Sequence, residues 1–254
     1  MNRGPAMQMK MSISPTVKKL IIANVFVWVV FQIILEKIIG FSFKNHFALF
    51  PGKVIFDLQI WQLASYMFLH TYSPFHILFN MLLLWWLGTE LEERWGRKFF
   101  LTYYLLCGIG AAVIYCLGVL IYAQLKSGGG AALPMMVPVM GASGAGFGLL
   151  LAYGILFGER VVHFMMMFPM KAKYMVMIMG AVEMSSLLTS DVNGGDVAYL
   201  AHLGGLAAGY IVLMSWGRMQ RFEWNRKVKK RQSKLRLVVD NEKPKAGEGP
   251  KYWN

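Results

Sequence analysis

Apolar residues along this 254-residue chain gather into six long runs separated by short polar segments. A helix needs about 17 to 25 predominantly apolar residues to cross the hydrocarbon core of a bilayer, and each run has such a length. We therefore predict an all-α membrane protein with a bundle of six transmembrane helices. The expected helices cover residues 17–38, 74–91, 99–123, 140–158, 174–190 and 197–216.

Composition supports a membrane protein and sets the domain boundaries. Hydrophobic residues make up 56% of the chain and charged residues 15%, whereas about a quarter of an average soluble domain is charged. No small-residue cleavage site follows the first run, so we expect a retained helix and not a removed signal peptide. The predicted organisation is a tail over 1–16, a six-helix domain over 17–216 and a basic tail over 217–254.

The distribution of Lys and Arg predicts the orientation, because cytoplasmic segments carry an excess of both. The N-terminal tail and the beginning of the first run together have four of these residues, the segments after the second and fourth runs have three each, and the chain after Trp216 has twelve. The segments after the first, third and fifth runs hold three in all, and Lys37 lies at the end of the first run. Both termini are therefore expected in the cytoplasm.

The net charge of +13 could indicate nucleic-acid binding, but much of it lies in the tail directly after the last apolar run. The orientation signal and attraction to anionic lipid headgroups explain such a tail more simply. We expect the bilayer, and no nucleic acid, as its partner.

Four polar side chains are expected at one depth in the outer third of the bilayer. Ser143 opens the fourth run, His202 lies near the start of the sixth, and His76 and Asn80 lie near the start of the second. These three helices share one direction, and polar groups within a span usually face the protein interior. Each residue alone also has a structural explanation, as a back-bonded hydroxyl, a packing residue or an interhelical contact. Their coincidence favours one site.

Small residues would let the fourth and sixth helices approach closely, as a hydrogen bond between Ser143 and His202 requires. A serine hydroxyl becomes a good nucleophile when an adjacent base, about 2.6 to 3.2 Å away, takes its proton. The residues expected to pack the two helices together form two G-x-x-x-G motifs, Gly144 with Gly148 and Gly205 with Gly209.

At these residues the sequence resembles the rhomboid intramembrane serine proteases over all six runs. The G-x-S-G motif is Gly141-Ala142-Ser143-Gly144, H-x-x-x-N runs from His76 to Asn80, and A-H-x-x-G-x-x-x-G begins at Ala201-His202. The segment GTELEERWG at 88–96 is similar to the family's G-x-x-x-E-x-x-x-G, with Glu92 in the acidic position.

The resemblance implies a role for each of these polar residues. Ser143 would be the nucleophile and His202 the general base and acid. His76, Asn80 and the backbone N–H of Ser143 would donate hydrogen bonds to the oxyanion. A metal or other cofactor is not expected.

Two positions depart from the family pattern. The family usually has Tyr one turn after the serine, where this chain has Phe147. We expect its ring to stack on His202 without offering a hydroxyl. The first loop commonly carries Trp-Arg and here reads Trp61-Gln62, so a structural contact of the arginine is expected to be lost.

No acidic residue lies at the depth of His202 on the second, fourth or sixth helix, so we predict a Ser-His dyad oriented by Phe147. Glu183, in the fifth run, is the one remaining acid within a span. A packing or gating role for it is as plausible as a catalytic one, and it is left out of the predicted site. The other titratable residues considered, assigned no role, are the loop histidines His46, His70 and His163 and the core cysteines Cys107 and Cys116.

The leading hypothesis is an endopeptidase that cuts transmembrane segments of other membrane proteins near the outer face. We expect it in a bacterial plasma membrane. The alternative is a non-catalytic rhomboid-like protein that binds or chaperones transmembrane helices. A zinc protease is unsupported because H-E-x-x-H is absent, and the nearest match to the aspartyl G-x-G-D, at 193–196, lacks its first glycine. A transporter would need charged binding residues or broken helices near the midplane.

Overall fold

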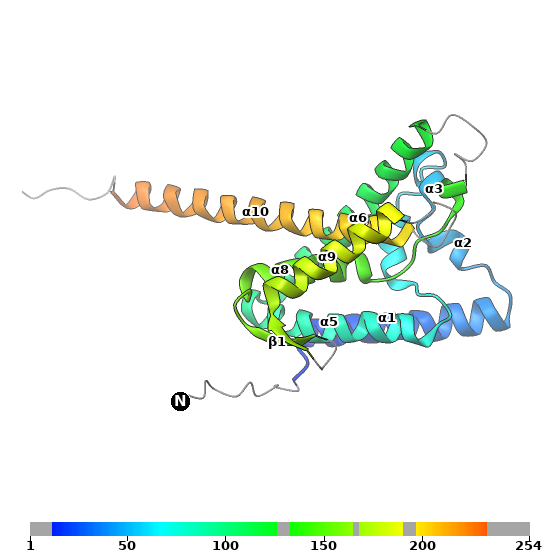
Figure 1. Ribbon diagram of the computed structural model, residues 1–254, viewed down its shortest axis with the longest axis horizontal. Coiled ribbons are helices and arrows are strands. Elements are labelled where there is room, and N and C mark those ends of the chain that lie inside the picture. Colours follow the sequence, from blue (N-terminus) through cyan, green and yellow to red (C-terminus); the bar gives the residue numbers. More distant parts are fainter. Residues whose placement is uncertain (1–11, 126–132, 165–167, 190–196, 233–254) are drawn as a thin grey trace, which may run out of the picture. The chain divides into compact units, whose positions relative to one another are not determined.

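The structure is a computed structural model that describes residues 12–125, 133–164, 168–189 and 197–232, mostly as helices (Figure 1). It divides into two compact units, Met1–Met214 and Ser215–Asn254, and all site residues lie in the first. The helices are α1 Pro15–Phe26, the π-helix η1 Val27–Ile38, α2 Lys44–Phe47, α3 Pro51–Ile55, α4 Gln62–Ser65, the 3₁₀ turn η2 Tyr66–Phe68, α5 Pro74–Trp95, α6 Arg97–Leu125, α7 Leu133–Met136, α8 Ser143–Leu156, α9 Ala172–Thr189 and α10 Val197–Gln232.

Each of the six predicted helices overlaps a helix of the structure. Three segments of the described residues are long and apolar enough to cross a membrane: Pro15–Ile38, Arg97–Leu125 and Ala198–Arg226. The count of six spans and the orientation stay predictions. The sixth predicted run, 197–216, lies within α10, which continues beyond it to Gln232 through Lys, Arg, Gln and Glu, residues that favour helix.

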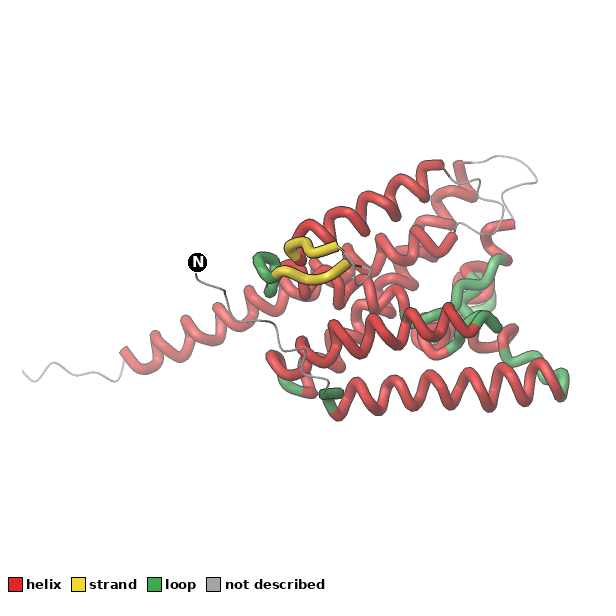
Figure 2. The backbone as a smooth tube through the Cα atoms, turned by 60° about the horizontal axis from the view of Figure 1, so that its bottom comes forward, coloured by secondary structure: helices red, strands yellow, loops and turns green. Residues whose placement is uncertain are grey.

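Two predicted connections contain regular structure. The segment after α8 contains two antiparallel strands, β1 Val161–Phe164 and β2 Phe168–Lys171 (Figure 2). Val161 pairs with Lys171. The first loop contains α2, α3, α4 and η2. Two residues expected in loops therefore lie in regular elements, His46 in α2 and His163 in β1.

Glu92 of α5 caps the beginning of α1, and these two helices lie side by side (Figure 1). Its buried carboxylate accepts hydrogen bonds from the Ser14 hydroxyl and from the backbone N–H groups of Thr16 and Val17, both at 3.1 Å. The first N–H groups of a helix have no partner within it, so an acid here satisfies two of them. The acidic position of the 88–96 segment therefore joins α1 to α5.

Gln62 holds the first loop together where the family pattern has arginine. Its side chain is fully buried, and its Oε1 accepts a hydrogen bond from the Phe50 N–H at 2.9 Å. Its Nε2 donates to the Gln59 side chain at 2.9 Å and to the His46 carbonyl at 3.3 Å. The glutamine thus makes structural contacts of its own at this position, whereas the contact of the family's arginine stays an untested expectation.

The π-helix η1 fixes the segment that precedes α5. Trp28 Nε1 donates to the Thr71 carbonyl at 2.9 Å, and Gln32 Oε1 accepts from the His70 N–H at 2.7 Å. The His70 side chain is fully buried, and neither of its ring nitrogens has a hydrogen-bond partner. Burial and the neighbouring His76 together lower the pKa of His70 to about 3. His70 is therefore neutral near pH 7.

Glycines allow α8 and α10 to touch backbone to backbone. A Cβ at Gly205 would overlap the carbonyl oxygen of Gly144, and one at Gly209 would lie 3.1 Å from Gly148 Cα. On another side of α8, a Cβ at Gly148 would lie 2.6 Å from Cys107 Cβ of α6. Any larger residue at these positions would push the helices apart. Both cysteines, Cys107 and Cys116, are buried and free.

Candidate active site

Ser143 is the first residue of α8, and the turn that precedes it depends on Gly141. Gly141 has φ +125°, a conformation that residues with a Cβ rarely adopt, and its N–H donates to the Tyr66 carbonyl at 3.0 Å. A Cβ at Gly141 would lie 3.1 Å from His76 Nε2 and 3.7 Å from Ser143 Oγ. Glycine therefore keeps the space between the His76 imidazole and the Ser143 hydroxyl open.

His202 of α10 lies beside Ser143. Its Nε2 is 2.8 Å from Ser143 Oγ, within the range for proton transfer from hydroxyl to imidazole. The Phe147 ring, one turn further along α8, stacks on the imidazole with ring centroids 4.4 Å apart and 13° between the planes. The structure thus brings the expected nucleophile, base and stacking residue together.

Glu183 of α9 contacts the other side of the imidazole, a contact that the sequence analysis missed. Its Oε2 lies 2.9 Å from His202 Nδ1, and the two side chains are only 10% and 18% exposed. A carboxylate accepts hydrogen bonds, so Nδ1 is the protonated nitrogen of a neutral His202. The lone pair of Nε2 then points at the Ser143 hydroxyl, which is the tautomer that a general base requires.

Thr71 orients the imidazole of His76 in the same way. The backbone N–H of Thr71 donates to His76 Nδ1 at 3.1 Å, so Nδ1 is an acceptor and the proton of the neutral ring is on Nε2. Nε2 is the atom that faces Gly141. His76 therefore presents an N–H donor to the space beside Ser143.

Asn80 is positioned by a bond within its own helix. Its Nδ2 donates to the His76 carbonyl one turn earlier, at 2.8 Å, and its Oδ1 is buried without a partner. An amide group has two N–H donors, so one remains for a ligand. The side chain is 8% exposed.

One cavity of about 460 Å³ joins the predicted polar residues. Its remaining lining is largely apolar, which suits a hydrophobic peptide segment. The lining residues are Thr71, Phe75, His76, Phe79, Asn80, Pro138, Val139, Met140, Ser143, Ala198 and His202. The described residues contain no group of three or more His, Cys, Asp or Glu that could hold a metal ion.

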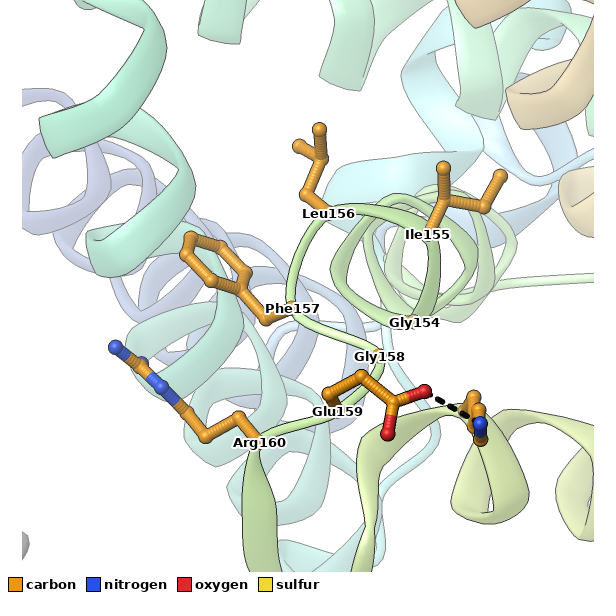
Figure 3. A pocket seen from close by; sticks show the side chains of 8 residues that line it. Gly154, Ile155, Leu156, Phe157, Gly158, Glu159 and Arg160 are labelled. Carbon is orange, nitrogen blue, oxygen red and sulfur yellow. Dashed lines mark hydrogen bonds and ion pairs between the residues drawn. The ribbon is translucent and has the colours of Figure 1, made fainter.

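A second cavity, of about 360 Å³, lies at the other end of α8 (Figure 3). It is lined by residues 154–160 and Lys173, which include no serine, cysteine or histidine. Glu159 accepts from Lys171 at 2.7 Å and from Lys173 at 2.5 Å, and these bonds lower the pKa of the Glu159 carboxyl to about 2. This cavity is bordered by ion pairs and has no hydroxyl, thiol or imidazole side chain in its lining.

Comparison with known families agrees with the motifs. The family described as "Rhomboid domain" matches residues 57–219. This chain belongs to the rhomboid family. It is therefore an integral membrane protein with a rhomboid all-α fold, and its family includes intramembrane proteases.

Individual relatives are distant rhomboids. The "Rhomboid-like protease 1" of Toxoplasma gondii is 28% identical over 178 residues, which cover 68% of this chain and 53% of that protein. The "Rhomboid protease GlpG" of Yersinia enterocolitica is 29% identical, over 70% of this chain and 56% of its own. The mitochondrial "Rhomboid protein 1" of Saccharomyces cerevisiae is 32% identical, over 56% of this chain and 37% of that protein. The chain thus spans about half the length of the curated relatives it matches.

Proposed function

We propose that this rhomboid is an active intramembrane serine endopeptidase that cuts transmembrane segments of other membrane proteins. The observation that carries the proposal is the 2.8 Å contact of Ser143 Oγ with His202 Nε2 inside a largely apolar cavity. A serine that only packs helices needs no base beside it, and its hydroxyl can bond back to its own helix.

Catalysis would proceed in two steps. The Ser143 hydroxyl gives its proton to His202 Nε2 as Oγ attacks the carbonyl carbon of the scissile peptide bond. When that bond breaks, Nε2–H protonates the leaving amine and an acyl ester remains on Ser143. Water then gives a proton to Nε2 and attacks the ester, and the returned proton restores the serine hydroxyl.

The oxyanion of each tetrahedral intermediate would lie in the space that Gly141 leaves open. Three donors surround it: the Ser143 backbone N–H, the Nε2–H of His76 and the remaining amide hydrogen of Asn80. In soluble proteases the loss of one such donor costs about 2.7 to 4 kcal/mol of transition-state stabilisation. The Ser143 N–H also belongs to the first turn of α8, where the helix dipole favours negative charge.

The proposed topology has six spans over residues 17–216, with the tails over 1–16 and 217–254 in the cytoplasm. Ser143 then lies near the outer face, so cleavage takes place there. The basic C-terminal tail would bind anionic headgroups of the inner leaflet, with transmembrane proteins as substrates and no nucleic acid as partner. A bacterial plasma membrane remains our expectation for its location.

A rhomboid-like protein that binds transmembrane helices without cutting them is the alternative. It would need the cavity but neither the Ser143 hydroxyl nor a correctly oriented His202. The retention of both, and the acceptor on His202 Nδ1, favour the enzyme.

Incubation of the detergent-purified protein with a generic single-span substrate tests the proposal. We expect cleavage by the wild type, none by Ser143→Ala, and wild-type cleavage by Ser42→Ala, which removes a hydroxyl from the first loop. Equal product from wild type and Ser143→Ala would refute the serine-protease mechanism. Binding of the substrate without cleavage by either would favour the non-catalytic alternative.

A further inference from the structure

We propose that Glu183 is a positioning residue that makes His202 a competent base, so that the reacting unit is Ser143, His202 and Glu183. This inference rests on the proposed function. The three side chains form one line of hydrogen bonds, 2.8 Å from Ser143 Oγ to His202 Nε2 and 2.9 Å from His202 Nδ1 to Glu183 Oε2. They come from three different helices, α8, α10 and α9.

The placement of Glu183 on α9 argues against a solvated or accidental acid. Much of this helix faces outward, with Met177 66%, Val182 53% and Leu188 77% exposed. Its buried residues are Ala172, Met175 and Glu183. An acid in an apolar helix is costly unless it has a partner, and functional sites commonly contain such residues. The imidazole of His202 is that partner.

Stacking on Phe147 leaves an ambiguity that Glu183 removes. A half turn of the imidazole about the bond that joins it to Cβ keeps the ring in the same plane, so stacking cannot distinguish the two orientations. That turn would replace Nε2 by a carbon opposite Ser143 and Nδ1 by a carbon opposite Glu183. The hydrogen bond to Glu183 selects the orientation, and it also selects the tautomer with its proton on Nδ1.

Glu183 also acts on the charge that appears during the reaction. As Ser143 gives up its proton, His202 becomes a cation, and a carboxylate 2.9 Å from Nδ1 stabilises it. This stabilisation is absent while the imidazole is neutral and the substrate is only bound. Loss of Glu183 should therefore lower kcat and leave KM nearly unchanged.

Two substitutions of similar size separate these contributions. Glu183→Met keeps the chain length and removes the acceptor, and Glu183→Gln keeps a carbonyl acceptor and removes the charge. We expect kcat to fall by about 100-fold in Glu183→Met and about 10-fold in Glu183→Gln, with KM within about twofold of wild type. The rate of Ser143 acylation by a fluorophosphonate, which needs no peptide substrate, should fall in the same order. Glu159→Gln, which removes a carboxylate beyond the far end of α8, is the matched control and should cleave as wild type.

Melting temperatures on the same preparations separate positioning from folding. A loss in kcat of at least about 10-fold in Glu183→Met, without a lower melting temperature, supports the proposal. Wild-type kcat, a change confined to KM, or a loss that follows a lower melting temperature would overturn it. If Glu183→Met does not fold, Glu183→Gln provides the test. A lower kcat at the wild-type melting temperature supports the proposal, and a wild-type kcat overturns it. Absence of Ser143-dependent cleavage by the wild type itself would instead remove the proposed function, and the inference with it.

Discussion

Replacement of Phe147 by alanine tests how much the flat ring contributes beyond the two hydrogen bonds of His202. The ring is 5% exposed and lies 4.4 Å, centroid to centroid, from the imidazole. In Phe147→Ala the hydrogen bonds of His202 to Ser143 and Glu183 remain. They join opposite sides of the imidazole and form an axis about which the imidazole can rotate. The stacked phenyl group blocks that movement.

The expected effects follow from this geometry. A displacement of the base by about 1 Å can cost on the order of 100-fold in rate, so we expect kcat of Phe147→Ala to fall between about 10- and 100-fold. The cavity left by the ring should also lower the free energy of unfolding by about 3 to 5 kcal/mol, the usual cost of a buried Phe→Ala change. Phe147→Tyr keeps the ring, and it should retain activity.

The assay measures initial cleavage rates and melting temperatures on the same preparations, at a temperature where each variant is folded. Phe147→Leu is the matched control, because it fills most of the volume without a flat face. We expect its melting temperature to lie near that of wild type and its kcat near that of Phe147→Ala. Wild-type cleavage by Phe147→Ala would refute the stacking role and leave the hydrogen bonds alone to orient His202.

Three further changes test other parts of the account. Asn80→Ala should lower kcat by about 100-fold or more at unchanged melting temperature, while the remaining oxyanion donors keep cleavage measurable; a lower melting temperature with full activity would make Asn80 structural instead. Glu92→Gln should lower the free energy of unfolding by about 1 to 3 kcal/mol, because charged hydrogen bonds to the beginning of α1 are lost. The control is Glu93→Gln, which changes an exposed side chain. Equal stability of the two variants would contradict the capping role of Glu92. Folding lowers the pKa of His70 from 6.5 to about 3, so the unfolded chain binds the proton more readily and stability falls as pH drops below 6.5, by about 2 kcal/mol at pH 5. The free energy of unfolding, measured at pH 7.5 and at pH 5, should fall between these pH values in the wild type but lack this contribution in His70→Met. The same pH dependence in both proteins would contradict the lowered pKa of His70.

The pairing of Ser143 with His202 could be predicted because both lie at the start of helices that run in one direction. Depth along a helix follows from 1.5 Å per residue, and the glycine spacing indicates which helices touch. Glu183 lies outside that comparison, because it belongs to the fifth helix, which is expected to run in the opposite direction. It lies six residues before the end of α9, about 9 Å, and His202 lies five after the beginning of α10, about 7.5 Å, so the matching depth was visible in the sequence.

Other parts of the fold could not be predicted from periodicity. The sequence does not show how each helix is rotated about its axis, so the inward direction of Glu183 depends on packing against the neighbouring helices. The first loop folds through single contacts between distant residues, such as the Phe50 N–H with Gln62, and its helices have at most five residues. The strands β1 and β2, of four residues each, are equally short. Elements of this size have too few residues for a helix or strand period to be recognised.

The reaction of Ser143 itself tests the central claim most directly. Purified protein is treated with a fluorophosphonate, and the modified residue is identified by tandem mass spectrometry in wild type, His202→Ala and a heat-denatured sample. We predict one adduct on Ser143 in the folded wild type and none in the other two samples, because the hydroxyl is nucleophilic only beside an oriented imidazole. An unmodified Ser143 in the wild type, or equal labelling in His202→Ala, would contradict the account.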